Sequence, residues 1–214
     1  MILIDGDPFA YRAAFSCEDQ ELADATDKVD DLIQMSIDAV AFEYNIEKYK
    51  VYLTGKGNFR YDISVSHEYK GNRKDVEKPH HLQGIRKHMS KNWEAEVSKG
   101  EEADDLIAIA ATEGGPESVV VSIDKDMLQI PCRHYNPNKR EFKVVDEFSG
   151  LKFFYKQILT GDRADNIIVL YGIGPPKAER LVTACKTGHV RYEMCLRECG
   201  REDDTEVENA RLLV

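Results

Sequence analysis

Two strand-like apolar runs in this chain of 214 residues each end directly in an acidic residue. Asp5 follows the run Met1 to Ile4, and Asp124 follows the run Ser118 to Ile123, which contains three consecutive valines. Continuous apolar runs of this length are typical of strands that are buried on both faces of a parallel sheet. Because the carboxyl ends of parallel strands lie at one edge of the sheet, we expect Asp5 and Asp124 to share that edge.

Further carboxylates accompany these two along the chain. The segment 102–105 reads Glu-Ala-Asp-Asp, Asp126 follows Asp124 by two residues, and Asp162 and Asp165 form a third pair. If the chain stays extended after the strand, Asp126 points the same way as Asp124. Carboxylates gathered around apolar strands repel one another unless cations lie between them. The acids therefore predict a divalent-metal site and, with the acid after the first strand, a two-metal phosphodiesterase.

Helix capping is an alternative explanation for part of this pattern. Glu102 and Asp105 share a face near the start of a helix expected from Asp104 to Ala111, where acids cap the helix and favour its dipole. Capping does not account for Asp124 and Asp126, since a buried strand rarely ends in two acids without a partner.

The net charge of −10 argues at first against a nucleic-acid partner, but the charge is unevenly distributed. Between Lys70 and Lys91 the chain carries seven Lys or Arg residues and only two acids. A basic segment beside a metal-loaded acidic centre suits a polyanion. An ordinary solvated, charged helix remains the alternative for this segment.

The remaining apolar pattern alternates strands and helices. Helical spacing covers Asp27 to Tyr44 and the chain from Phe153 onward, and a helix is expected with Pro79 in its first turn. Strand patterns cover Lys50 to Leu53, and two short strands are expected within Arg133 to Val145. This alternation predicts an α/β fold with a mostly parallel sheet.

Gly172-Ile173-Gly174 lies between two helical stretches. Glycines let the backbone approach a phosphate closely, and the amides at the start of the following helix face the anion. Such a motif is often only a turn. Here the flanking helices, and Lys177 in the first turn of the second one, favour a helix-hairpin-helix clamp on the DNA backbone.

Cysteine usage and hydropathy exclude several classes of protein. Five cysteines without a Cys-x-x-Cys pair argue against a disulfide framework and against a structural zinc site. No apolar run approaches the roughly 20 residues that span a bilayer, and the chain begins with a strand instead of a basic signal region. We therefore expect a monomeric protein without a membrane partner, located in the cytoplasm, which is the host cytoplasm if a phage encodes it.

Taken together, the motifs resemble the successive signatures of the 5′ nucleases, which include phage 5′-3′ exonucleases, flap endonucleases and the 5′-nuclease domain of bacterial DNA polymerase I. In chain order they are Ile4-Asp5-Gly6, Glu68-Tyr69-Lys70-Gly71-Asn72-Arg73, Glu102-Ala103-Asp104-Asp105, Ser122-Ile123-Asp124-Lys125-Asp126-Met127, Gly161-Asp162-Arg163-Ala164-Asp165-Asn166, Gly172-Ile173-Gly174 and Asn209-Ala210-Arg211-Leu212-Leu213. The match spans nearly the whole chain in the order of the family.

The resemblance implies a fold and a division of the chain. The fold is a Rossmann-like (PIN-like), mostly parallel central sheet flanked by helices, with a helical arch and a C-terminal helix-hairpin-helix. Residues 1–150 would form the catalytic core, including the arch at about 66–95, residues 151–200 the helix-hairpin-helix DNA-binding region, and residues 201–214 a segment that returns to the core.

The resemblance also implies roles for individual residues. The metal-site acids are Asp5, Glu102, Asp104, Asp105, Asp124, Asp126, Asp162 and Asp165. They would hold two Mg²⁺ or Mn²⁺ ions, and a K⁺ ion would bind at the helix-hairpin-helix. Lys70 and Arg73 match catalytic cations that offset charge on the phosphoryl oxygens. The DNA-binding residues are Tyr69, Lys74, Gly172, Gly174 and Lys177. For Tyr69, stacking on a base and anchoring the arch to the core are both open.

The implied reaction is metal-dependent hydrolysis of DNA, or of RNA–DNA hybrid, at 5′ ends, flaps or nicks, which gives 5′-phosphate products. One departure weakens one metal site, because alignment through Lys56 and Arg60 places Gly55 where the family usually has a metal-binding Asp. Asp7 is the substitute we expect. Two alternatives stay open, a PIN-type ribonuclease and a catalytically weakened, structure-specific DNA-binding protein.

Overall fold

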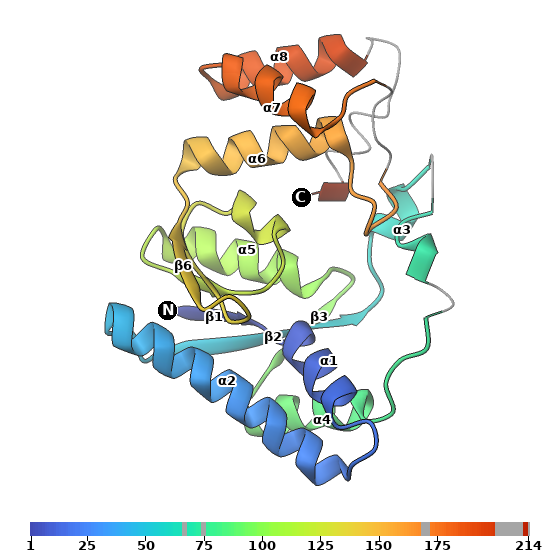
Figure 1. Cartoon of the computed structure of the whole chain (residues 1–214), viewed down its shortest axis with the longest axis vertical. Helices are drawn as coiled ribbons and strands as arrows, with labels where there is room; N and C mark the ends of the chain where they lie inside the picture. Colours follow the sequence, from blue (N-terminus) through green and yellow to red (C-terminus); the bar gives the residue numbers. More distant parts are fainter. Residues whose placement is uncertain (66–67, 74–75, 168–171, 200–211, 214) are drawn as a thin grey trace. The chain divides into compact units, whose positions relative to one another are not determined.

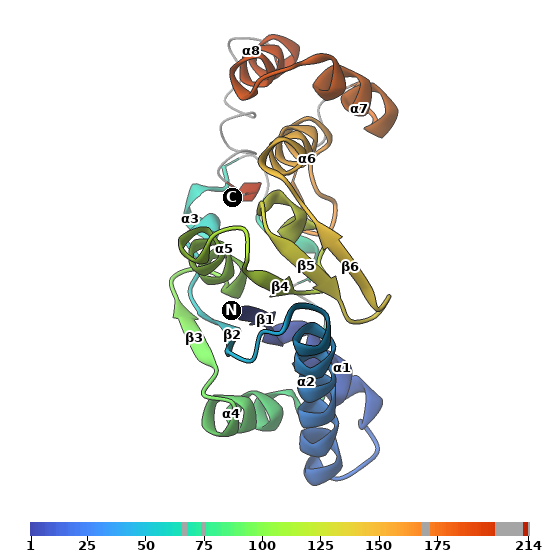
Figure 2. The same ribbon diagram turned by 90° about the vertical axis from the view of Figure 1, so that its left-hand side faces the viewer.

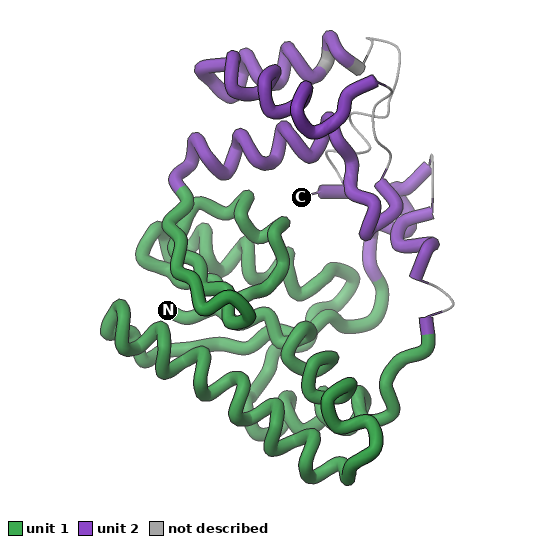
Figure 3. Tube along the Cα trace, viewed as in Figure 1, with its two compact units in different colours: residues 1–57, 77–145 green, residues 58–76, 146–214 purple. Residues whose placement is uncertain are grey.

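The computed structural model describes residues 1–65, 68–73, 76–167, 172–199 and 212–213, and the chain forms two compact units (Figure 3). Unit 1 consists of residues 1–57 and 77–145, and unit 2 consists of residues 58–76 and 146–214. The expected catalytic core of residues 1–150 therefore differs from unit 1, because residues 58–76 group with the C-terminal helices.

Unit 1 contains a central sheet. Among the described residues it has six strands, in the order β3-β2-β1-β4-β5-β6. The strands are β1 (Ile2–Asp5), β2 (Tyr49–Lys56), β3 (Glu96–Lys99), β4 (Val119–Val121), β5 (Arg133–Asn136) and β6 (Glu141–Val144). All neighbours are parallel except β5 and β6, which form an antiparallel pair. This is the doubly wound order: β2 and β3 are added on one side of β1, and β4, β5 and β6 are added on its other side. The predicted Rossmann-like α/β class is confirmed.

Helices cover both faces of this sheet (Figures 1 and 2). The helices of unit 1 are α1 (Gly6–Ser16), α2 (Leu22–Tyr44), α4 (Leu82–Asn92) and α5 (Ala103–Gly114), and a 3₁₀ turn, η2, spans Asp126–Gln129. Ile2 and Ile4 of β1 pack with α1, α2 and α4, whereas Leu3 packs with α5 on the opposite face. The alternation of side chains along β1 explains why its whole run is apolar.

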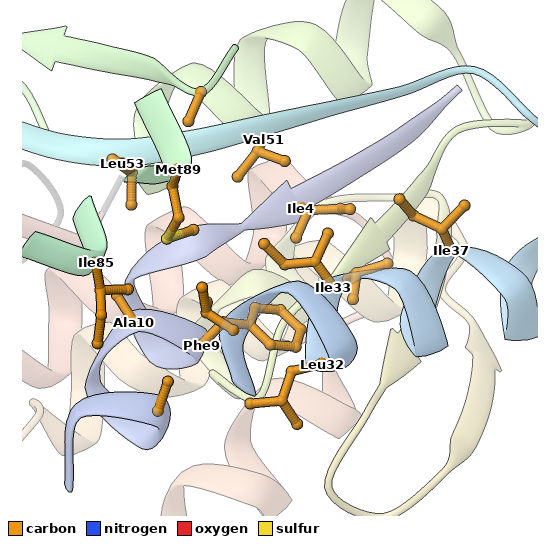
Figure 4. Close-up of a cluster of buried hydrophobic side chains, with 14 of the residues drawn as sticks. Ile4, Phe9, Ala10, Leu32, Ile33, Ile37, Val51, Leu53, Ile85 and Met89 are labelled. Carbon is orange, nitrogen blue, oxygen red and sulfur yellow. The ribbon is translucent and has the colours of Figure 1, made fainter. Parts of the chain in front are cut away.

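The larger core cluster joins side chains from β1, β2, α1, α2 and α4 (Figure 4). Helix α2 begins five residues before the predicted Asp27 because Glu21 and Asp24 form a capping box at its start. It ends at Asn45, which adopts the left-handed conformation with φ 54°.

One strand and one α-helix of unit 1 were not predicted. In β3 only Ser98 is buried among four residues, so no apolar period marks the strand. Helix α1 begins directly after Asp5, without a loop that would separate it from β1. Gly6 permits this sharp transition, because a Cβ at that position would lie 2.7 Å from the carbonyl oxygen of Tyr52.

The expected arch at about 66–95 contains α4, which is a core helix of unit 1. Leu82, Ile85 and Met89 are buried at helical spacing and pack against α1 and α2. Pro79 precedes the N-cap residue His81, so the prediction that it lies in the first turn is wrong.

Unit 2 is helical within its described residues. Its elements are α3 (Arg60–Ile63), the 3₁₀ turn η1 (Gly71–Arg73), α6 (Glu147–Thr160), α7 (Pro175–Ala184) and α8 (Gly188–Cys199). Helices α6, α7 and α8 share one apolar cluster. Of the expected returning segment, Leu212 packs with Tyr69 and its carbonyl accepts from Arg60 Nε at 3.0 Å, and residues 201–211 and 214 lie outside the described residues.

In the part of the chain that the structure describes, no helix has the length and apolar character that crossing a membrane requires. The monomeric state and the cytoplasmic location stay predictions.

Replacing Met89 by Ala tests the packing of α4. Met89 is fully buried, so the cavity should lower the free energy of unfolding by about 2–4 kcal/mol in urea denaturation. Met35→Ala, on the exposed side of α2 where Met35 is 57% exposed, should change it by less than about 0.5 kcal/mol. Equal effects of the two substitutions would show that α4 does not pack into the core.

Candidate functional site

The carboxyl ends of β1 and β4 meet at the point where the strand order reverses, which is where doubly wound folds bind ligands. Asp5 ends β1, and Asp124 follows β4 by three residues. Ser122 links them, because its hydroxyl donates to Asp5 Oδ2 at 2.8 Å and accepts from the backbone N–H of Asp124 at 3.0 Å. The two predicted acids thus lie at one edge. Ser122 begins the motif Ser122 to Met127, but no sequence pattern predicts its role.

Asp5 is held in an environment that disfavours its charge. It is 4% exposed, and its burial raises the pKa from the ordinary value of 3.8 to about 7. The hydrogen bond from Ser122 opposes this shift, whereas the carboxylates of Asp7 and Asp124 add to it. A proton or a cation at this edge would relieve the repulsion.

Asp126 does not follow Asp124 along an extended chain as predicted, because the 3₁₀ turn η2 begins at Asp126. The backbone N–H of Asp126 donates to Asp124 Oδ1 at 2.9 Å, which closes a tight turn around the Asp124 side chain. Asp124 is exposed and Asp126 is half-buried. Lys125 Nζ lies 3.8 Å from Asp126 Oδ1.

Glu102 and Asp105 cap α5. The backbone N–H of Glu102 donates to Asp105 Oδ2 at 2.8 Å, and the Glu102 side chain accepts from the backbone of Asp105 in return. The capping alternative is therefore confirmed. Asp104 lies half-buried in the first turn of the same helix. That these acids also bind metal stays a prediction.

At Gly55, where the family usually has an Asp, backbone atoms of β3 fill the space that a side chain would need. A Cβ at Gly55 would lie 1.8 Å from the carbonyl oxygen of Ser98, and the Gly55 N–H donates to Ser98 Oγ at 2.9 Å. No side chain fits there without moving β3. Asp7, the expected substitute, accepts from the backbone N–H of Thr54 at 2.9 Å and pairs with Arg86.

Among the described residues, no three His, Cys, Asp or Glu side chains stand as a group that could hold a metal ion. Asp5, Asp7 and Asp124 are nevertheless close enough for the latter two to raise the pKa of the first. All the donors are oxygens, which is the set that Mg²⁺ and Mn²⁺ prefer. The donor chemistry and the unbalanced charge fit a hard divalent ion.

In unit 2, Asp165 organises the loop that carries the expected catalytic cations. Its Oδ1 accepts from Arg73 Nη2 at 2.9 Å, its Oδ2 accepts from the Tyr69 hydroxyl at 3.0 Å, and its carbonyl accepts from the Lys70 N–H at 2.9 Å. Lys70 Nζ lies 3.9 Å from Oδ2. Asp162 is 4% exposed, and its Oδ1 accepts from the backbone N–H of Ala164 at 2.7 Å. The structure thus brings Lys70, Arg73 and Asp165 together.

Tyr69 does not present its ring to a base. It is 2% exposed, packs with Ile167 and Leu212, and lies edge-on to Tyr61 with ring centroids 5.6 Å apart. The burial of Tyr69 argues against base stacking, and its contacts anchor it within unit 2, to Ile167 and Leu212, instead of to the sheet core. Lys74, the neighbouring DNA-binding candidate, lies outside the described residues.

The Gly172 to Gly174 turn differs from a simple amide cradle. Gly172 has φ +73°, which favours glycine, and Gly174 is the N-cap residue of α7. Pro175 and Pro176 follow as the first two helical residues, so two of the expected amide donors are absent. Lys177 Nζ lies 3.5 Å from Glu198 Oε2.

The helix expected before this turn is further away than the sequence indicated. Helix α6 ends at Thr160, and the described residues 161–167 that follow it are not helical. Residues 168–171 lie outside the described part of the chain. The helix-hairpin-helix assignment therefore stays a prediction.

Comparison with known proteins gives the class of the chain. The family described as 5′-3′ exonuclease, N-terminal resolvase-like domain, matches residues 1–151. The chain belongs to this family.

Individual relatives agree with this assignment. DNA polymerase I of Chloroflexus aurantiacus is 28% identical over 234 residues, which cover 92% of this chain and 24% of that protein. Flap endonuclease Xni of a Shewanella species is 27% identical over 134 residues, which cover 56% of this chain and 51% of that protein. The chain spans between about a quarter and about half of the length of these relatives.

Solved structures share the fold. The 5′-exonuclease of bacteriophage T5 with bound zinc matches with a TM-score of 0.68 at 16% identity, covering 100% of this chain and 88% of that one. A flap endonuclease of the same phage, in a pseudo-enzyme–product complex with DNA and metal ions, matches with a TM-score of 0.61 at 14% identity, covering 99% and 97%.

The raised pKa of Asp5 predicts how stability changes with pH in the metal-free protein. The folded state keeps a proton that the unfolded chain releases near pH 4, so this contribution is complete below that pH and is lost as the pH rises to about 7. As the pH rises from 4 to 7, the free energy of unfolding of Asp5→Asn, measured by urea denaturation, should therefore fall less than that of wild type. Asp31→Asn, at an exposed position of α2, should behave as wild type. Identical slopes for all three proteins would contradict the burial of Asp5.

Tyr69→Phe tests the anchoring role. The substitution keeps the ring packing but removes the hydrogen bond to Asp165, so it should lower the free energy of unfolding by about 1.5 kcal/mol. Tyr61→Phe is the control, because Tyr61 is 51% exposed and should lose little. No difference between the two variants would mean that the hydroxyl of Tyr69 is not bonded in solution.

Proposed function

We propose that this chain is a divalent-metal-dependent 5′ nuclease that hydrolyses phosphodiester bonds in DNA. The observation that carries the proposal is the buried Asp5 at the switch point of the sheet, whose pKa is raised by burial and by the carboxylates of Asp7 and Asp124. Membership of the 5′-3′ exonuclease family supports the same activity.

The acids of unit 1 would hold the metal in this proposal. Asp5 and Asp124 would bind through carboxylate oxygens, and Glu102, Asp104, Asp105 and Asp126 would bind directly or through water. Mg²⁺ or Mn²⁺, two ions in the full proposal, would supply activation of a water for in-line attack and stabilisation of the leaving 3′ oxygen. Ser122 orients Asp5, because its hydroxyl donates to Oδ2, and an ionised carboxylate keeps further lone pairs that could bind the ion.

The residues of unit 2 contribute charge to the proposed mechanism. Lys70 and Arg73 offset the negative charge that develops on the phosphoryl oxygens, which is a task that preorganised cations perform well. Both are held by Asp165, so this carboxylate fixes their positions before substrate arrives. Asp162 and Asp165 are also proposed as metal ligands, and substitution by Asn tests that role separately from the acids of unit 1.

The proposed substrate is DNA with 5′ ends, flaps or nicks, or an RNA–DNA hybrid, and the products carry 5′ phosphates. The bacteriophage T5 flap endonuclease complex with DNA and metal ions supports a DNA substrate. Backbone amides of the Gly172 to Gly174 turn would hold a phosphate, with K⁺ between the turn and the backbone of the nucleic acid. Lys177 must leave Glu198 to contact a phosphate.

A second candidate is a structure-specific DNA-binding protein with weakened catalysis. The closure of Gly55 by the Ser98 carbonyl favours it, because one ligand of the family is absent and cannot be restored by substitution. This candidate binds branched DNA without metal and does not cleave it, even in excess Mn²⁺.

Cleavage assays distinguish the two candidates. Purified protein is incubated with 5′-labelled flap, nicked, blunt and hybrid substrates in Mg²⁺, Mn²⁺ or chelator. Wild type should cleave only with metal, and Asp5→Asn and Asp124→Asn should each lower the rate about 100-fold or more. Asp31→Asn is the matched control and should cleave as wild type. Cleavage by Asp5→Asn at the wild-type rate would overturn the proposed function.

A further inference from the structure

Arg86 of α4 reaches the carboxyl end of β2, next to the closed position Gly55. Its Nη1 donates to Asp7 Oδ1, and its Nη2 donates to the carbonyl oxygen of Thr54. The side chains of Arg86 and Asp7 are 23% and 20% exposed, so this ion pair is largely covered. In the sequence, Arg86 is one of the seven basic residues between Lys70 and Lys91, and no motif marks it.

The ion pair of Arg86 and Asp7 also makes hydrogen bonds with the backbone of β2 at Thr54. The register of β2 against β3 shifts between Leu53 and Lys56, so Thr54 lies at an irregularity of the ladder. Asp7 accepts from the Thr54 N–H at 2.9 Å, and Arg86 donates to its carbonyl, so side chains satisfy both backbone groups. Thr54 Oγ1 also accepts from the N–H of Ala103, the first residue of α5, at 3.1 Å.

This geometry places the positive charge of Arg86 against one of the carboxylates near Asp5. Asp7 is one of the two carboxylates that act on Asp5, and Arg86 is the cation that faces Asp7. On the same side of the edge, Gly55 can carry no acid because the Ser98 carbonyl fills the space. The guanidinium therefore offsets one negative charge of the group formed by Asp5, Asp7 and Asp124.

We propose that Arg86 is a positioning residue that serves as a fixed cation beside the metal centre, engaging Asp7 and lowering the net negative charge that a divalent ion meets at Asp5 and Asp124. The inference rests on the proposed function in that it presupposes a divalent ion at Asp5. Its consequence is that the charge of Arg86, acting through Asp7, sets the affinity for metal.

The test is Mn²⁺ binding to the metal-free protein without DNA, followed by the electron paramagnetic resonance signal of free Mn²⁺. Arg86→Gln should bind Mn²⁺ about threefold more tightly or bind an additional ion, because a screened positive charge is removed and Asp7 is released. Arg86→Lys retains the charge and should stay close to wild type. Lys87→Gln removes a neighbouring exposed charge and should leave the affinity unchanged.

A second variant keeps the inference testable if Arg86→Gln fails to fold, which circular dichroism and thermal melting will show. Asp7→Asn leaves the charge of Arg86 unbalanced, so it should weaken Mn²⁺ binding by about the same factor. If Asp7→Asn does not weaken Mn²⁺ binding, or if folded Arg86→Gln binds Mn²⁺ as wild type does, the role of Arg86 is overturned while the proposed function stands. If wild type itself binds no Mn²⁺, both the proposed function and this inference fail.

Discussion

The burial of one carboxylate, that of Asp5, determines what the rest of the metal-binding edge must supply. β1 runs between β2 and β4, and α1 starts directly behind the carboxylate, because Gly6 leaves no Cβ to meet the carbonyl of Tyr52. The hydroxyl of Ser122 stabilises the charged form, but desolvation is the larger effect and raises the pKa to about 7. A cation at this edge would lower this pKa and favour the charged form of Asp5 at neutral pH.

The other acids combine a structural task with the proposed chemical one. Asp105 caps α5, Asp124 closes the turn into η2, and Asp165 holds Arg73 and Lys70 within unit 2. An ionised carboxylate has about four acceptor positions, so one backbone hydrogen bond still leaves oxygens for a metal. These hydrogen bonds hold the backbone of the acids before any ion arrives, which lowers the entropic cost of binding one.

The parts of the fold and the site that depend on local pattern were predictable. β1 and β4 are buried on both faces, so their apolar runs and the acids that end them were visible in the chain. β3 carries no strand pattern because only Ser98 faces the core, whereas the two prolines that remove amide donors from α7 can be read directly from the sequence. The closure of Gly55 and the burial of Tyr69 depend on contacts between residues far apart in sequence. No local pattern reports such contacts.

The most direct measurement is the anomalous diffraction of crystals of the wild-type chain grown or soaked with Mn²⁺. We predict an anomalous peak at the carboxyl edge of β1 and β4, within about 2.0–2.3 Å of oxygens of Asp5 and Asp124, as hard divalent ions require. A map with no peak at this edge, in crystals that bind Mn²⁺ elsewhere, would contradict the assignment of these acids as the metal centre.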